Sequence, residues 1–139
     1  MEESKLKALV VDDEGVIRDF LSRLLVLNSV EVKSAVNGFR AIEMAQSEEF
    51  DLIFLDVRMP DMDGFKALKE LKGISPKTRY VMMTGYVVDN LLEEARKEGD
   101  FGFVKKPFVI EEIIFQIEEA RRLKKGLKSS GGGDGRPQD

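Results

Sequence analysis

A short apolar segment near the N-terminus reads Leu6-Lys7-Ala8-Leu9-Val10-Val11 and is followed at once by two carboxylates, Asp12-Asp13. Apolar runs of this length occur both in buried strands and in parts of helices. The abrupt change to acidic residues favours a strand here. The segment Asp51–Leu55 repeats the pattern and is followed by Asp56. We therefore predict two buried strands that are each followed by carboxylates.

Three further segments are strand candidates. The segment Tyr80–Met83 is apolar and leads into Thr84-Gly85, and the weaker candidates are Val30–Ser34 and Phe101–Val104. Between the strands, apolar residues recur at helical spacing. The predicted helices cover Glu14–Leu27, Asn37–Ser47, Asp63–Lys72, Val88–Lys97 and Ile110–Lys125, with Asn37 as an N-cap and Gly73 as the end of the third helix.

Strands and helices thus alternate five times along the chain. This order is typical of an α/β domain with a parallel sheet, and continuous apolar strands indicate that helices cover both faces. Right-handed crossovers leave few topologies. We predict a doubly wound, flavodoxin-like (βα)5 domain with five parallel strands in the order 2-1-3-4-5. Its functional site should lie beyond the carboxyl ends of the first and third strands.

The composition limits the chemistry that the chain can perform. It has 139 residues, of which 42% are hydrophobic and 35% are charged, as expected for one globular domain. There is no cysteine and no histidine, which excludes disulfides, thiolate and imidazole metal sites, and catalytic triads that use histidine. The net charge of −4 argues against non-specific binding to nucleic acid or to anionic membranes.

The sequence shows no targeting signal. No apolar stretch approaches the roughly 18 to 20 residues that span a bilayer, and no signal-peptide pattern precedes the first strand. These observations predict a cytoplasmic protein. No large apolar side chain occurs from Ser129 onward, and we predict that residues 127–139 form a flexible Gly/Ser-rich tail.

Polar side chains follow the predicted strands at one edge of the sheet. Asp12, Asp13 and Asp56 form a cluster of carboxylates that would repel one another without a cation. Mg²⁺ suits this cluster because it prefers carboxylate and water oxygens. Lys106 adds a positive charge suited to an anionic group, and Thr84 adds a hydroxyl. Together these groups are what phosphoryl transfer to a central carboxylate requires.

Each of these residues also has an ordinary structural interpretation. Asp13 could cap the first helix, Lys106 could be a solvated surface lysine, and Thr84 could be a turn hydroxyl. Their joint occurrence at successive strand ends favours a functional site over independent caps and turns.

Four segments resemble the receiver domain of bacterial two-component response regulators, and the resemblance spans about residues 5–125. The segments are Val10-Val11-Asp12-Asp13-Glu14, Leu55-Asp56-Val57-Arg58-Met59-Pro60-Asp61-Met62-Asp63-Gly64, Met82-Met83-Thr84-Gly85-Tyr86 and Phe103-Val104-Lys105-Lys106-Pro107-Phe108. The resemblance implies a receiver domain over residues 1–126. It also implies that Asp12, Asp13, Asp56 and the backbone carbonyl of Arg58 hold Mg²⁺.

The resemblance further implies that Asp56 is the phosphoacceptor and that Lys106 and Thr84 contact the phosphoryl group. In this family the bond that corresponds to Lys106-Pro107 is often cis. Thr84 and Phe103 stand at the positions of the switch residues, although Phe103 lacks the hydroxyl of the tyrosine that is often found there.

Two bulky residues, Arg58 and Tyr86, stand where the family tunes the lifetime of the phosphate. They suggest slow self-dephosphorylation, which a phosphate half-life of seconds would contradict.

We therefore expect a response regulator that takes a phosphoryl group from a sensor histidine kinase or a histidine phosphotransfer protein. Phosphorylation would change the face formed by the fourth helix, the fifth strand and the fifth helix, and so signal to a downstream protein target. The chain would act as a monomer or a phosphorylation-linked dimer, without direct contact to nucleic acid or membrane. It would not be an enzyme beyond catalysing its own phosphorylation and dephosphorylation.

Two alternatives stay open. A Mg²⁺-dependent aspartate-nucleophile phosphatase of the haloacid dehalogenase type also uses Asp, Thr and Lys, but its Asp-x-Asp signature is replaced here by Asp12-Asp13-Glu14. Turnover of a small phosphate ester would favour that class, whereas single-turnover self-labelling favours a receiver. The second alternative is a receiver that binds partners without being phosphorylated, although every key position is filled.

Overall fold

A computed structural model describes residues 5–85 and 101–126 of the chain. Its five strands are β1 (Leu6–Val11), β2 (Val30–Ala35), β3 (Leu52–Asp56), β4 (Arg79–Thr84) and β5 (Gly102–Lys105). They form one parallel sheet in the order β2-β1-β3-β4-β5. The predicted strand order of the doubly wound α/β sheet is therefore confirmed.

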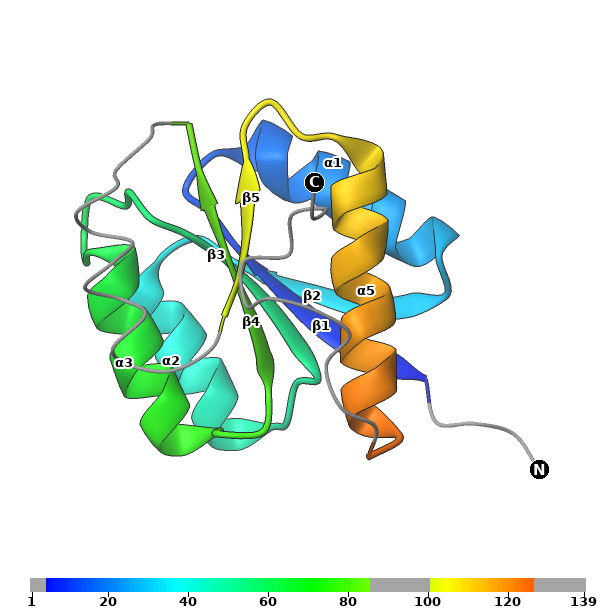
Figure 1. Cartoon of the computed structure of the whole chain (residues 1–139). Coiled ribbons are helices and arrows are strands. Elements are labelled where there is room, and N and C mark those ends of the chain that lie inside the picture. The colour runs from blue at the N-terminus through cyan, green and yellow to red at the C-terminus, as the bar shows by residue number, and fades with distance from the viewer. Residues whose placement is uncertain (1–4, 86–100, 127–139) are drawn as a thin grey trace.

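Helices cover both faces of this sheet (Figure 1). The structure describes α1 (Gly15–Leu27), α2 (Gly38–Ser47), α3 (Gly64–Ile74) and α5 (Ile110–Lys124). Figure 1 shows α1 and α5 on one face and α2 and α3 on the other. The predicted helix Val88–Lys97 and the predicted tail lie outside the described residues. No described helix is long and apolar enough to cross a membrane.

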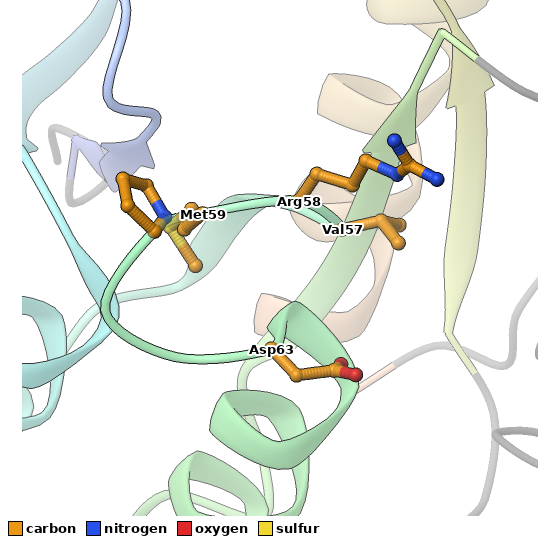
Figure 2. A pocket seen from close by; sticks show the side chains of 5 residues that line it. Val57, Arg58, Met59 and Asp63 are labelled. Atoms are coloured by element: carbon orange, nitrogen blue, oxygen red, sulfur yellow. The ribbon is translucent and has the colours of Figure 1, made fainter.

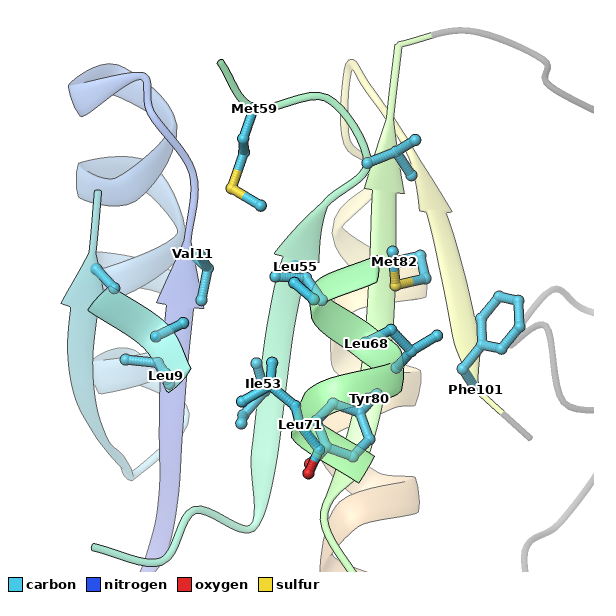
Figure 3. Close-up of a cluster of buried hydrophobic side chains, with 14 of the residues drawn as sticks. Leu9, Val11, Ile53, Leu55, Met59, Leu68, Leu71, Tyr80, Met82 and Phe101 are labelled. Carbon is cyan, nitrogen blue, oxygen red and sulfur yellow. The ribbon is translucent and has the colours of Figure 1, made fainter. Parts of the chain in front are cut away.

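Alternate residues of each strand enter two separate hydrophobic clusters, because successive side chains of a strand point to opposite faces. Leu9 and Ile53 belong to the cluster beneath α2 and α3, part of which Figure 3 shows. Val10 and Phe54 belong to the cluster beneath α1 and α5. Burial on both faces accounts for the continuous apolar strands in the sequence.

The helix ends confirm some of the predictions and correct others. Asn37 is the N-cap of α2, and its side chain accepts a hydrogen bond from the N–H of Arg40. The proposed stop at Gly73 is wrong, because α3 continues to Ile74. Asp13 does not take the capping role that its ordinary interpretation would give it, because Glu14 is the N-cap of α1 and its side chain makes no capping hydrogen bond.

Candidate functional site

The carboxyl ends of the central strands deliver the site residues to one edge of the sheet. Asp12 follows β1, whereas Asp56 and Thr84 are the last residues of β3 and β4. Asp56, the last residue of β3, pairs with Met83 of β4. Thr84 therefore lies one residue further along the neighbouring strand. This register brings residues that are far apart in the sequence to adjacent strand ends.

The three predicted carboxylates lie together. One oxygen from each of Asp12, Asp13 and Asp56 lies within 4.8 Å of the other two. Asp12 is completely buried and Asp56 is 5% exposed, whereas Asp13 is open to solvent. Oxygen ligands clustered in this way, with one open side, fit a hard divalent cation such as Mg²⁺ that retains part of its water shell.

Lys106 reaches into this cluster from the segment after β5. Its Nζ lies 2.8 Å from Oδ2 of Asp12 and 3.5 Å from Oδ2 of Asp56. Burial by itself would lower the pKa of Lys106, but the hydrogen bond to Asp12 and the charge of Asp56 outweigh burial and raise it. Lys106 therefore remains a cation between two carboxylates. The Lys106-Pro107 bond is cis, as the resemblance implied.

The surroundings of Asp56 change the pKa of its carboxyl group. Burial raises its pKa to about 6, and the nearby charge of Asp12 acts in the same direction. Lys106 and the N–H of Arg58, which lies 3.3 Å from Oδ1, oppose this rise. The carboxylate of Asp56 is thus held in a place where additional positive charge would stabilise it.

The predicted switch residues are both buried. Thr84 is 2% exposed at the end of β4. Phe103, on the neighbouring strand β5, is 3% exposed and belongs to the hydrophobic cluster beneath α2 and α3. The ring of Phe103 is therefore packed inside the domain in this structure. Tyr86 lies outside the described residues.

A family model for the response regulator receiver domain matches residues 8–118. The chain belongs to this family. Receiver domains act in two-component signalling, in which they accept phosphoryl groups from histidine kinases or phosphotransfer proteins, and they generally bind Mg²⁺ at an acidic pocket. The family match favours this function over the phosphatase alternative.

Curated relatives include both short and long proteins. The chain is 36% identical over 117 residues to the regulatory protein AtoC of Escherichia coli, and the match covers 84% of this chain but 25% of AtoC. It is 33% identical over 118 residues to sporulation initiation phosphotransferase F of Bacillus subtilis, with 85% of this chain and 95% of the relative covered.

Two solved structures show the same similarity. The chemotaxis protein CheY4 of Vibrio cholerae superposes with a TM-score of 0.78 at 31% identity, and the match covers 84% of this chain and 99% of CheY4. A response regulator from Burkholderia pseudomallei, solved with a phosphorylated aspartic acid and a calcium ion, has a TM-score of 0.76 at 26% identity. That match covers 88% of this chain and 72% of the other.

The receiver domain has a pocket of about 480 Å³ next to the end of β3. The loop after β3 lines it with Val57, Arg58, Met59, Pro60 and Asp63. Figure 2 shows the Arg58 and Asp63 side chains apart from each other at this pocket. The pocket therefore includes Arg58, the predicted lifetime-tuning residue, which follows Asp56 by two residues.

Two residues that support the site, Glu14 and Arg18, could not be identified as site residues from the sequence. The N–H of Glu14 donates to Oδ1 of Asp12 at 2.9 Å, and Arg18 donates to the backbone carbonyl of Asp12 at 2.8 Å. Both contacts depend on the path of the chain between β1 and α1. Residue type and spacing give no indication of that path.

The raised pKa of Asp56 makes the stability of the metal-free receiver domain depend on pH. A carboxyl group with a raised folded-state pKa contributes stability that is complete below its unfolded value of 3.8 and is lost as the pH rises through about 6. We expect metal-free Asp56→Asn to be more stable than the wild type above this range, by about 1–2 kcal/mol after screening by solvent. The two free energies of unfolding should converge as the pH falls.

Urea unfolding with a chelator present, at a series of pH values, measures this difference. Parallel pH profiles for the two proteins would show that folding does not raise the pKa of Asp56.

Proposed function

We propose that Asp56 is the phosphoacceptor of this receiver domain. A carboxylate oxygen of Asp56 attacks the phosphorus of a phosphohistidine on the donor protein and forms a new O–P bond. The N–P bond breaks, and its electron pair stays on the imidazole nitrogen of the donor. The observation that carries this proposal is the place of the Asp56 carboxylate, which is buried at the end of β3 close to the carboxylates of Asp12 and Asp13 and 3.5 Å from Nζ of Lys106.

The same cluster supports a metal site. Asp12, Asp13, Asp56 and the backbone carbonyl of Arg58 would hold Mg²⁺, which when bound offsets the negative charge of the phosphoryl oxygens. The phosphorylated aspartic acid and calcium ion named for the Burkholderia relative support this arrangement. Asp12 is already oriented, because Glu14 and Lys106 each donate to one of its carboxylate oxygens.

Lys106 would exchange its carboxylate partners for the phosphoryl group. The acyl phosphate adds about −1.5 to −2 charges beside Asp56. Nζ of Lys106 lies within 4.0 Å of oxygens of Asp12, Asp56 and Glu14, so it can reach the new charge without a change of backbone position. The Thr84 hydroxyl, at the neighbouring strand end, would donate a hydrogen bond to the same group.

The output of this site would be a change of packing rather than turnover of a substrate. Movement of Thr84 towards the phosphate would bias the packing of Phe103 and hence the face that includes β5 and α5. A cognate histidine kinase or phosphotransfer protein would act as donor in the cytoplasm, and a downstream protein would read the changed face. We propose that the chain catalyses only its own phosphorylation and dephosphorylation.

Locating the phosphoryl group tests this proposal. The chain would be incubated with acetyl phosphate and Mg²⁺, reduced with borohydride to trap the acyl phosphate, and digested for peptide mass spectrometry. The expected modification lies at position 56. Modification of Asp12 or Asp13 instead, or repeated turnover of a phosphate ester without trapping, would contradict it.

A further inference from the structure

Arg18 lies on α1, close to the turn that carries Asp12 and Asp13. Its Nη1 donates to the backbone carbonyl of Asp12, and the two atoms are 2.8 Å apart. The guanidinium also lies over the start of the helix, because a Cβ added to Gly15 would lie 3.5 Å from Nη2. The side chain of Arg18 thus folds back along the helix and connects α1 to the backbone of the carboxylate cluster.

Asp12 is held by contacts from four directions. Its N–H donates to the carbonyl of Ala35 at 3.2 Å, while its carboxylate accepts from the N–H of Glu14 at 2.9 Å and from Lys106 at 2.8 Å. The bond from Arg18 to its carbonyl completes the set. Of the two long side chains that contact Asp12, Arg18 bonds its backbone carbonyl and Lys106 bonds its carboxylate, so replacement of Arg18 removes a backbone contact and leaves the bond from Lys106 in place.

The position of Arg18 is unfavourable for the helix itself. The N-terminus of a helix carries partial positive charge, so a cation near it is destabilising. The first turn of α1 has no acidic residue and no capping side chain to offset this charge. The benefit of a cation here therefore comes from outside the helix, namely from the carbonyl of Asp12 and the adjacent carboxylates.

We propose that Arg18 is a positioning residue for the carboxylates that bind Mg²⁺, a role that rests on the proposed function. By holding the carbonyl of Asp12, Arg18 fixes the backbone turn that presents the side chains of Asp12 and Asp13 towards Asp56. Without this bond the turn has more conformations, which must be given up when the cation binds. Contacts of this kind behind metal ligands have large effects on metal affinity.

Replacement of Arg18 distinguishes a positioning role from an effect of its charge, because the two would change the affinity for Mg²⁺ in opposite directions. Arg18→Met removes a positive charge near three carboxylates, which alone would tighten Mg²⁺ binding. Loss of positioning should instead weaken binding, by about tenfold. Isothermal titration of the unphosphorylated chain with Mg²⁺ measures the dissociation constant directly.

Three further variants complete the test. Arg18→Gln is neutral and too short to keep the bond, so it should lose affinity as Arg18→Met does. Arg18→Lys keeps a charged donor and should recover part of the loss. Arg23→Met, at an exposed position on the same helix, should bind Mg²⁺ as the wild type does.

The outcomes distinguish this role from the proposed function. Unchanged or tighter Mg²⁺ binding by both Arg18→Met and Arg18→Gln would overturn the positioning role, while phosphorylation of wild-type Asp56 would stand. A wild type that binds Mg²⁺ more tightly than the Arg18 variants, but is never phosphorylated at Asp56, would overturn the proposed function and leave the positioning role intact.

Discussion

Replacing Asp56 with asparagine is expected to abolish labelling of the chain by acetyl phosphate. The asparagine side chain has nearly the same size, and its amide oxygen can still accept from the N–H of Arg58, so the end of β3 should be preserved. The amide is, however, a far poorer nucleophile than the carboxylate and cannot form the acyl phosphate. Incorporation of radiolabelled phosphate in the presence of Mg²⁺ measures the effect, which should fall to background.

Asp63 offers a matched control for this experiment. It follows the same strand by seven residues and caps α3 by accepting from the N–H of Phe65. Asparagine caps helices about as well as aspartate does, so Asp63→Asn should fold normally and be labelled like the wild type. Undiminished labelling of Asp56→Asn would show that another residue accepts the phosphoryl group.

The helix α3 contains two glycines, Gly64 and Gly73. We expect replacement of Gly64 with alanine to lower the stability of the domain more than the same change at Gly73. A Cβ at position 64 would lie 2.2 Å from the carbonyl oxygen of Asp56 and 2.7 Å from Cα of Val57. These are backbone atoms, and the N–H of Gly64 is itself bonded to the carbonyl of Val57 at 2.9 Å. Relief of the clash requires displacement of α3 from β3. We expect the free energy of unfolding to fall by about 3 kcal/mol or more.

Gly73→Ala, on the same helix, is expected to stabilise the domain instead. Nothing lies within 4 Å of a Cβ added there. An alanine in this helical position should raise the free energy of unfolding by about 0.5–1 kcal/mol, because it restricts the unfolded chain. Urea unfolding of both variants measures the contrast. Equal stability of the two variants would show that the close approach at Gly64 is not rigid.

Much of the fold could be predicted because it depends on local patterns. Buried strands such as Leu6–Val11 leave continuous apolar runs, and the change to helical spacing marks the segments between them. Strand order followed from general rules of handedness rather than from any single residue. Element ends were less accurate: β3 includes Asp56, and α3 extends through Gly73, because hydrogen bonding across the sheet and along the helix overrides residue preference there.

The inner face of α5 shows a second limit of pattern analysis. Its spacing of apolar residues predicts an apolar contact with the sheet, yet Gln116 and Glu119 are both buried. Gln116 accepts hydrogen bonds from Arg79 at the start of β4. Gly102 leaves the space for this side chain, because an added Cβ would lie 2.3 Å from its oxygen. Such pairing joins residues distant in sequence, and no local periodicity encodes it.

By itself, the sequence determined the type of fold and the residues that gather at the strand ends. Asp12, Asp56 and Thr84 could be assigned to one edge because the carboxyl ends of parallel strands meet there. Only the tertiary structure decided how these groups interact. Lys106 lies closer to Asp12 than to Asp56, and Arg18 holds the carbonyl of Asp12. Such distances depend on strand register and on the path of the loops, which are set by packing of the whole domain rather than by neighbouring residues.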